Sequence, residues 1–285
     1  GTDENPKIQI VDAKTEAVHS VWQGAAQHGL HKFVWSPDAA MLAIETTFEG
    51  DGNLVLWDVD REQTISRWQK KQLPYKDSFA HIQWSDDSTR VAIAARGDVG
   101  DNGSVVHNLH AHIIDVATGK RILKHQLGGR SDNSHVTALS WSPSGQALAC
   151  AGTQGLIEVL DIDSGHVGLS RKLHNAQIDA MTWSPDGRRL ASASQDGTVK
   201  VLAATSGAEL LTFQFDENSP KQLTWSPDGH RLAAATESGT IHVWDAGRGH
   251  EFSEDGSRRG ELAMAYYRRA LPSRGAMERP ALQEF

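Results

Sequence analysis

The sequence predicts an all-β fold, a β-propeller built from four-stranded antiparallel blades, and a recurring five-residue string is the main reason. The string WSPDG occurs at 183–187 and at 225–229, with the variants WSPDA at 35–39, WSPSG at 141–145 and WSDDS at 84–88. Short apolar runs flank the copies, and the copies recur with a basal period of 42 residues. Repeated units of this size cannot bury their own apolar faces, so they stack on one another.

The copy at 174–213 is the cleanest, and its turn residues divide it into four short strands. In the SPDG turn the proline restricts φ, the aspartate caps the turn through its side chain, and the glycine accepts a positive φ. Asp196–Gly197 is a strong hairpin signal. Radial stacking of such four-stranded sheets forms a propeller. We expect the four strands at 178–183, 189–194, 198–202 and 208–213.

Most of the nine tryptophans occupy repeated positions, which indicates a structural role. A tryptophan at the end of a strand supplies a large apolar area between adjacent sheets. We therefore interpret these residues as packing residues of the repeat. They are Trp35, Trp84, Trp141, Trp183 and Trp225 at the ends of first strands, and Trp57 and Trp244 at the ends of third strands.

The repeats divide the chain into a propeller at 1–250 and a linker with a helical tail at 253–285. Five full repeats plus a half blade leave two arrangements, since closed propellers have four to eight blades. Either both ends of the chain complete a six-bladed ring, or the blades are part of a larger ring of seven, which we favour. The blades are expected near 8–22 (partial), 31–68, 79–127, 136–172, 176–213 and 221–252.

Two segments depart from the repeat. Eleven residues are inserted into blade two, and because they fall within the glycine-rich stretch 97–110 we expect a solvated loop there. At the other end, 261–271 is rich in strong helix formers and precedes Pro272, which predicts a helix. A stray strand pair at 256–266 is the alternative for this region, because FSEDG at 252–256 echoes WSPDG.

The ends of the third strands carry a second recurring signal. They read LWD at 56–58, ID at 114–115, LD at 160–161 and VWD at 243–245. Together with the WSPDG strings, they resemble the WD-repeat (WD40) family, in the style common among bacterial members. The resemblance covers roughly residues 8–250. It implies a propeller that usually has seven blades and that serves as a platform for protein partners.

The family resemblance also implies a buried network of Asp, His, Ser or Thr, and Trp in each blade. Only LH at 173–174 retains part of the Gly-His pair that opens many family repeats, and only two third strands carry tryptophan. The network is therefore expected to be incomplete in most blades. In the tail, AYYRRA at 265–270 resembles the opening of a tetratricopeptide repeat.

Composition and charge exclude several partner classes. The formal net charge is −8 and the basic residues form no long stripe, so binding to nucleic acid is disfavoured. No run of eighteen apolar residues is present, so we expect no membrane span and a cytoplasmic location. The one cysteine, Cys150, lies in an apolar run and is expected to be a small buried hydrophobe.

No enzyme motif is found, so we expect no catalytic residues and no cofactor. The SPDG aspartates Asp38, Asp186 and Asp228 recur in equivalent turns and are expected to form those turns. For a metal, His110 and His112 share a strand face and are weak candidates, since a zinc site needs three or four ligands. Asp98 is part of a calcium-like loop that lacks the closing glutamate.

Loops held by a rigid scaffold are the usual place for binding residues. In the family arrangement, the connections between blades share a face with the turns between second and third strands. Tyr75 and Arg130 are the preferred anchors, because aromatic and arginine side chains dominate binding hot spots. The candidate partner-binding residues on this face are His28, His31, Tyr75, Lys76, Arg130, Asp132, His174, Asp216 and Glu217.

Three functions are compatible with these observations. The first is a non-catalytic protein-interaction or sensory platform of a bacterial multidomain signalling protein, with a protein or peptide partner. The second is an enzyme-associated propeller related to TolB and prolyl peptidases, whose repeats also use WSPDG. The third is a structural fragment without a partner of its own. The strings QDGTVKV at 195–201 and SGTIHVWD at 238–245 favour the first.

Overall fold

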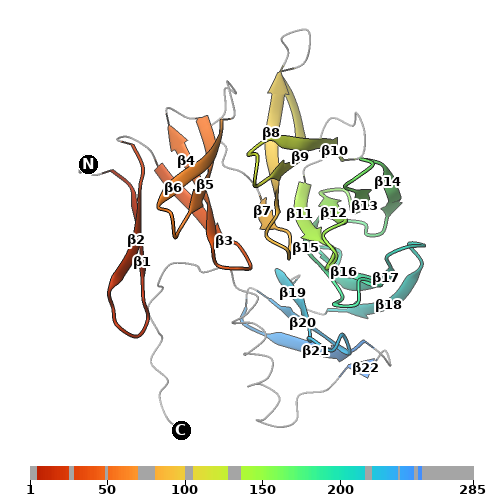
Figure 1. Cartoon of the computed structure of the whole chain (residues 1–285). Helices are drawn as coiled ribbons and strands as arrows, with labels where there is room; N and C mark the ends of the chain where they lie inside the picture. The colour runs from red at the N-terminus through yellow and green to blue at the C-terminus, as the bar shows by residue number, and fades with distance from the viewer. Residues whose placement is uncertain are drawn as a thin grey trace.

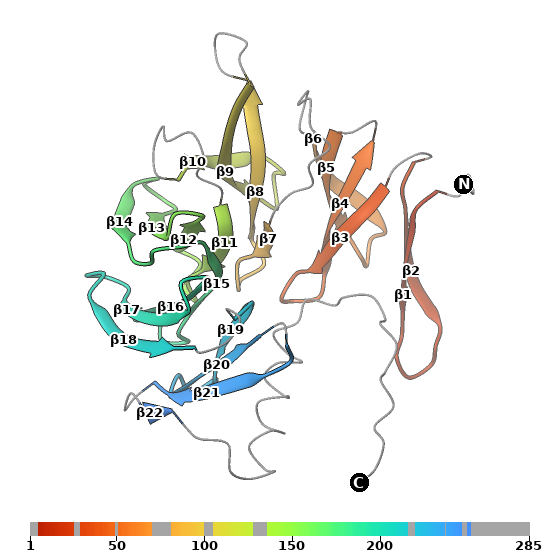
Figure 2. The same cartoon turned by 180° about the vertical axis from the view of Figure 1, so that it is seen from behind.

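The structure is a computed structural model of the 285-residue chain. In the residues that it describes, all regular structure is β-strand, in five four-stranded antiparallel sheets and one two-stranded sheet. The sheets are arranged around a common centre (Figure 1; Figure 2 gives the view from behind). The predicted all-β fold with four-stranded blades is confirmed. The described residues are 5–25, 29–48, 51–69, 81–99, 105–127, 136–215, 220–236, 238–246 and 250–251.

The first three sheets hold the N-terminal part of the chain. The half blade is β1(Lys7–Val11) and β2(Val18–Gln23). Blade one is β3(Gly29–Trp35), β4(Met41–Phe48), β5(Asp51–Asp58) and β6(Gln63–Gln69). Blade two is β7(His81–Trp84), β8(Arg90–Val99), β9(Val105–Asp115) and β10(Arg121–Gln126).

The other three blades are more regular, and their strands pair in chain order from the first to the fourth. Blade three is β11(Val136–Trp141), β12(Ala147–Gly152), β13(Leu156–Asp161) and β14(Val167–Lys172). Blade four is β15(Ile178–Trp183), β16(Arg189–Ser194), β17(Thr198–Ala203) and β18(Glu209–Gln214). Blade five is β19(Gln222–Trp225), β20(Arg231–Ala235), β21(Ile241–Asp245) and β22(His250–Glu251).

The SPDG turn has the chemistry expected from its sequence. In blade four, the Ser184 hydroxyl donates a hydrogen bond to Asp186, and the Asp186 carboxylate accepts one from the backbone N–H of Arg188 at 3.0 Å. Gly187 has a φ of +68°. At the equivalent position of blades one and two, Ala39 and Ser88 both have a φ of +59°. The turn thus keeps its conformation where glycine is absent, with a strained backbone at these two residues.

A tryptophan ties each blade to the blade before it. The indole N–H of Trp183 donates to the backbone carbonyl of Ser140, the residue before Trp141, at 3.0 Å. The same bond recurs at the three other junctions between complete blades, always to the residue before the preceding tryptophan. The other donors are Trp84 to Val34 at 3.1 Å, Trp141 to Gln83 at 3.1 Å and Trp225 to Thr182 at 3.3 Å.

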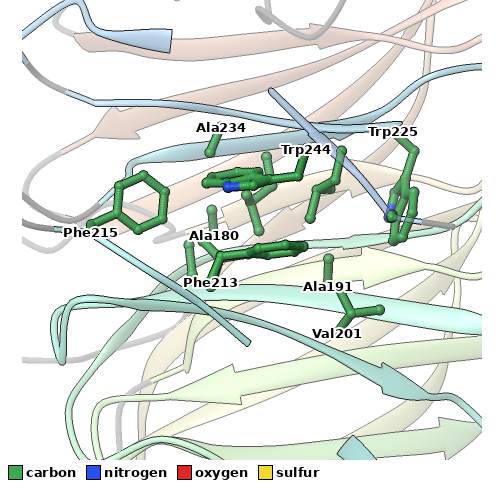
Figure 3. Close-up of a cluster of buried hydrophobic side chains, with 13 residues drawn as sticks. Ala180, Ala191, Val201, Phe213, Phe215, Trp225, Ala234 and Trp244 are labelled. Carbon is green, nitrogen blue, oxygen red and sulfur yellow. The ribbon is translucent and has the colours of Figure 1, made fainter. Parts of the chain in front are cut away.

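The core lies in the seams between blades. The seam between blades four and five contains Phe213 stacked on Trp244, with ring centroids 4.7 Å apart, and Phe215 against the edge of Trp244 (Figure 3). Trp244 is 1% exposed. Next to the SPDG turn of blade four, the guanidinium of Arg189 lies 4.6 Å from the centroid of the Trp225 ring. Large apolar area and a cation–π contact therefore stabilise this junction.

The expected loop at 97–110 is the main correction to the sequence interpretation. Much of this segment continues β8 and β9, because Asp98 pairs with Val106 and Val99 pairs with Val105. The ladder bears an irregularity between Arg96 and Asp98. The result is a long hairpin that rises beyond the neighbouring strands (Figure 1). Backbone pairing of an inserted segment satisfies its N–H and C=O groups, which a loop leaves to solvent.

The expected helix at 261–271 and the tetratricopeptide-like string at 265–270 lie outside the described residues.

A Trp183→Phe substitution tests the bond between blades. It removes one N–H and leaves the buried carbonyl of Ser140 without its donor, so we expect a loss of about 1–3 kcal/mol in the free energy of unfolding. Trp35→Phe is the matched control, because the Trp35 indole makes no such bond in the described structure. Urea denaturation of both variants would measure the difference. Equal losses in the two variants would contradict the role given to the bond.

Candidate functional site

The turns between second and third strands form one face together with the connections between blades. This follows from the antiparallel order, because both kinds of connection lie at the same end of the strands. Blade three shows how they pack: the backbone N–H of Leu173, in the connection to blade four, donates to the carbonyl of Gly155 at 2.9 Å. We call this the connection face. The β8–β9 hairpin rises from it.

A buried network fixes the connection face at blade four. The ring nitrogen Nε2 of His174 lies 2.8 Å from the hydroxyl of Ser192, and Nδ1 lies 3.1 Å from a carboxylate oxygen of Asp196. Thr198 donates its hydroxyl to Asp196 at 2.6 Å, and the backbone N–H of Asn175 also donates to Asp196, at 3.0 Å. The network joins three segments, so the connection between blades three and four cannot move independently of the turn at 195–197.

Burial sets the protonation states of this network. Burial lowers the pKa of His174 below its usual value, and this outweighs the opposing effect of the Asp196 carboxylate. Burial works against ionisation of Asp196 as well, but the hydrogen bonds from Thr198 and the Asn175 N–H hold its pKa below the usual value. The arrangement therefore contains a neutral imidazole that donates from Nδ1 to a charged carboxylate and accepts from Ser192 at Nε2.

Ser192, His174 and Asp196 have the connectivity of a hydrolase triad, but the position of the serine does not suit catalysis. Ser192 and the side chain of His174 are both 0% exposed. A nucleophilic serine must reach a substrate carbonyl, and a hydroxyl enclosed by the blade has no such access. The network serves to hold the backbone of the connection face.

A second polar group lies on the same face, at the junction of blades four and five. The carboxylate of Asp179 accepts from Lys221 at 2.6 Å, from Gln177 at 2.7 Å and from Gln195 at 3.0 Å. Burial opposes ionisation of Asp179, but the hydrogen bond from Lys221 and those from the two amides lower its pKa. The Lys221 side chain is 38% exposed. The group therefore links two blades through an ion pair whose lysine side chain is partly exposed.

Exposed polar side chains surround these fixed groups. Gln154 lies in the turn between the second and third strands of blade three, and Gln195 lies in the equivalent turn of blade four. Asn175 lies in the connection between the two blades. All three are exposed. The described part of the connection face thus offers amide donors and acceptors at positions that the backbone holds in place.

The structure describes two of the nine candidate partner-binding residues. His31 is exposed on β3. His174 lies on the expected face, but its side chain is buried in the network described above, so it has no surface to offer a partner. The remaining candidates lie outside the described residues: His28, Tyr75, Lys76, Arg130, Asp132, Asp216 and Glu217.

The candidate metal ligands His110 and His112 are neighbours on β9, with ring centroids 6.0 Å apart. Both are buried. Nδ1 of His112 lies 3.4 Å from the guanidinium of Arg121, and the His112 ring lies 5.0 Å from that of Trp68. A cation next to a ring nitrogen disfavours a second cation there. No group of three or more metal-ligating side chains occurs in the described residues.

Cys150 is buried in β12, and burial raises the pKa of its thiol, with Glu158 adding to the effect. Glu158 accepts from Ser170 at 3.0 Å, and its other oxygen lies 2.7 Å from Nε2 of His125 in blade two. The raised pKa keeps the thiol protonated, which is typical of a packing residue and not of a nucleophile.

Sequence reasoning missed the arginines that bridge blades on the opposite face. Arg90, the first residue of β8, donates to the carbonyl of Gly145 in blade three at 3.0 Å. Arg189, the first residue of β16, donates to the carbonyl of Gly229 in blade five at 2.6 Å. The two arginines occupy the same position of the repeat, five residues after the serine of the SPDG turn. The recurrence of arginine at this repeat position is the sequence signal from which the bridges could have been predicted.

Comparisons with known proteins agree with this geometry. A family model described as "WD domain, G-beta repeat" matches residues 168–201 and 208–245. A model described as "Anaphase-promoting complex subunit 4 WD40 domain" matches residues 113–183. A search of curated proteins finds no match.

Among solved structures, a chain in the "Crystal Structure of Mitotic Checkpoint Complex" is similar, with a TM-score of 0.60 and 21% sequence identity. The similarity covers 78% of this chain and 64% of that chain. At this level of identity the likeness shows a shared fold.

The packing of Gly155 against the blade connection predicts a large effect of Gly155→Ala. Gly155 has a φ of +76°, and a Cβ here would overlap with the carbonyl oxygen of His174. We expect a loss of about 3 kcal/mol or more in the free energy of unfolding, because the backbone at His174 must move to make room for the added methyl group. Gly239 is the matched control, with a φ of +87° and open space around it. Gly239→Ala should cost about 1 kcal/mol from backbone strain alone. Thermal or urea unfolding would separate the two, and a similar cost for both would contradict the packing argument.

The lowered pKa of His174 predicts a pH effect on stability. As the pH falls below 6.5, the ordinary pKa of histidine, His174 binds a proton in the unfolded chain but stays neutral in the folded chain. The free energy of unfolding therefore decreases. The fall in the urea midpoint between pH 7.5 and 5.5 should therefore be larger for the native chain than for His174→Gln. His166, which is exposed, provides the control. His166→Gln should keep the native pH dependence, and an unchanged profile in His174→Gln would contradict the prediction.

Proposed function

We propose that this chain, which belongs to the WD-repeat family, is a non-catalytic platform that binds a protein or peptide partner on its connection face. Propellers of this family are in general protein-interaction scaffolds. The observation that carries the proposal is the fixed backbone under this face. The His174 network and the Asp179 group hold its connections, while Gln154, Asn175 and Gln195 remain exposed.

Rigid display is the physical basis of the proposed binding. A partner that binds flexible loops must order them, and that ordering reduces affinity. On the connection face, the Asp196 carboxylate already holds the backbone N–H of Asn175, and the Asp179 carboxylate holds the side chains of Gln195 and Lys221. The exposed amides can donate and accept hydrogen bonds. These groups suit a polar polypeptide segment.

We further propose a biological setting for this platform. The WSPDG style of the repeats resembles bacterial WD-repeat proteins, which favours a sensory or regulatory module within a larger bacterial signalling protein. Such a module would act in the cytoplasm. No helix that could span a membrane occurs in the described residues, and the net charge of −8 disfavours nucleic acid as the partner.

The test is affinity capture with the full chain, followed by measurement of the dissociation constant of each captured partner. One variant changes exposed residues of the connection face, Gln154→Arg with Asn175→Arg. A second changes the two anchors predicted from the sequence, Tyr75→Ala with Arg130→Ala. Replacement of interface residues by charged or truncated side chains should weaken binding about tenfold or more, since central contacts carry most of the binding energy. Calorimetry or surface plasmon resonance would measure the change.

The control changes exposed residues of the opposite face, Arg188→Ala with His230→Ala, which lie in SPDG turns. This variant should bind the partner as the native chain does. Native affinity in both of these variants, with a loss in the control, would place the binding site on the SPDG face. Hydrolysis of ester or peptide substrates by the purified chain would contradict the non-catalytic assignment.

A further inference from the structure

The β1–β2 hairpin contacts blade one with one of its two faces. Ile8 and Trp22 are a cross-strand pair, both are buried, and they pack with Leu42, Ile44 and Trp57 of blade one. At the far end of the hairpin Val11 and Val18 are 55% and 52% exposed. The apolar contact that the structure describes is therefore confined to one part of this two-stranded sheet.

Among the described residues, the seam between β1–β2 and blade one contains no tryptophan–carbonyl bond of the kind that joins complete blades. Every junction between complete blades contains a tryptophan indole bound to a carbonyl of the preceding first strand. The half blade consists of two strands in the described structure, and the Trp35 indole of blade one has no carbonyl of this kind to bind. Across this seam, Nε2 of His19 lies 3.3 Å from a carboxylate oxygen of Asp60, and the two side chains are 55% and 76% exposed. Exposed pairs of this kind contribute little.

Three buried polar atoms reduce the stability of the same seam. The hydroxyl of Ser20, the hydroxyl of Thr46 and the indole N–H of Trp57 are buried and have no hydrogen-bond partner among the residues that the structure describes. Ser20 shares a strand face with Trp22, and Thr46 shares one with Ile44, so both point into the seam. A buried polar group without a partner has lost its hydrogen bonds to water and forms no hydrogen bond within the protein to replace them.

We propose that β1–β2 is a releasable hairpin, which detaches from blade one as a unit while blades two to five stay folded. Release returns the hydroxyls of Ser20 and Thr46 and the indole N–H of Trp57 to water, and this offsets part of the apolar contact that is lost. The open state exposes the apolar surface of Leu42, Ile44 and Trp57. The hairpin thus acts as a cover over an apolar face of blade one, and this role does not depend on the identity of a partner.

Native-state hydrogen–deuterium exchange of the full chain, measured by mass spectrometry, tests this proposal. Peptides that cover 7–23 should exchange about tenfold faster or more than peptides that cover 178–214, as expected for a sub-global opening. Thr46→Val keeps the shape of the side chain and removes the unpartnered hydroxyl. It should slow exchange of 7–23 about tenfold, because the closed state no longer buries that group. Ser20→Ala should act in the same direction.

Ser192→Ala is the control, because Ser192 is a buried hydroxyl that has a partner, His174. This variant should speed exchange of 178–214 and leave 7–23 unchanged. Equal protection of 7–23 and 178–214 in the native chain would overturn the proposal. Fast exchange of 7–23 that neither Thr46→Val nor Ser20→Ala slows would also overturn it, since it would show fraying of the strands and not release from the seam.

Discussion

The hydrogen bond from a tryptophan indole to a backbone carbonyl of the preceding blade sets the spacing of the five complete blades. Its acceptor is always the residue before the preceding tryptophan, as with Trp183 and Ser140. The bond therefore relates each first strand to the next by a constant offset and prevents the strands from sliding past each other. The SPDG turn holds each tryptophan at the end of its strand. Turn chemistry within a blade thus controls the packing between blades.

The fold could be predicted because local signals recur. In blade four the turn residues placed β15 and β16 without error, and β17 and β18 to within one residue. Proline, aspartate and glycine act on their immediate neighbours, so their effects can be read from the sequence. Ala39 and Ser88 show that the repeat as a whole dominates, since both adopt the positive φ that the turn requires without glycine.

The site was harder to predict because its residues meet through contacts distant in sequence. His174 looked like an exposed loop residue, but Ser192 and Asp196, about twenty positions later, enclose it. The inserted residues of blade two carried loop-like glycines and aspartates, yet pairing between β8 and β9 extended the hairpin. The preferred anchors Tyr75 and Arg130 remain predictions, and the Asp179 group emerged only from the meeting of blades four and five.

The buried thiol of Cys150 has a practical consequence for labelling chemistry. It is the single cysteine of the chain, it is 0% exposed, and it lies in the central strands of blade three. A thiol reagent can modify it only in molecules whose blade has opened, so the rate of modification reports how often that opening occurs. The native chain therefore carries its own site-specific probe of ring integrity, and no engineered label is needed to follow it.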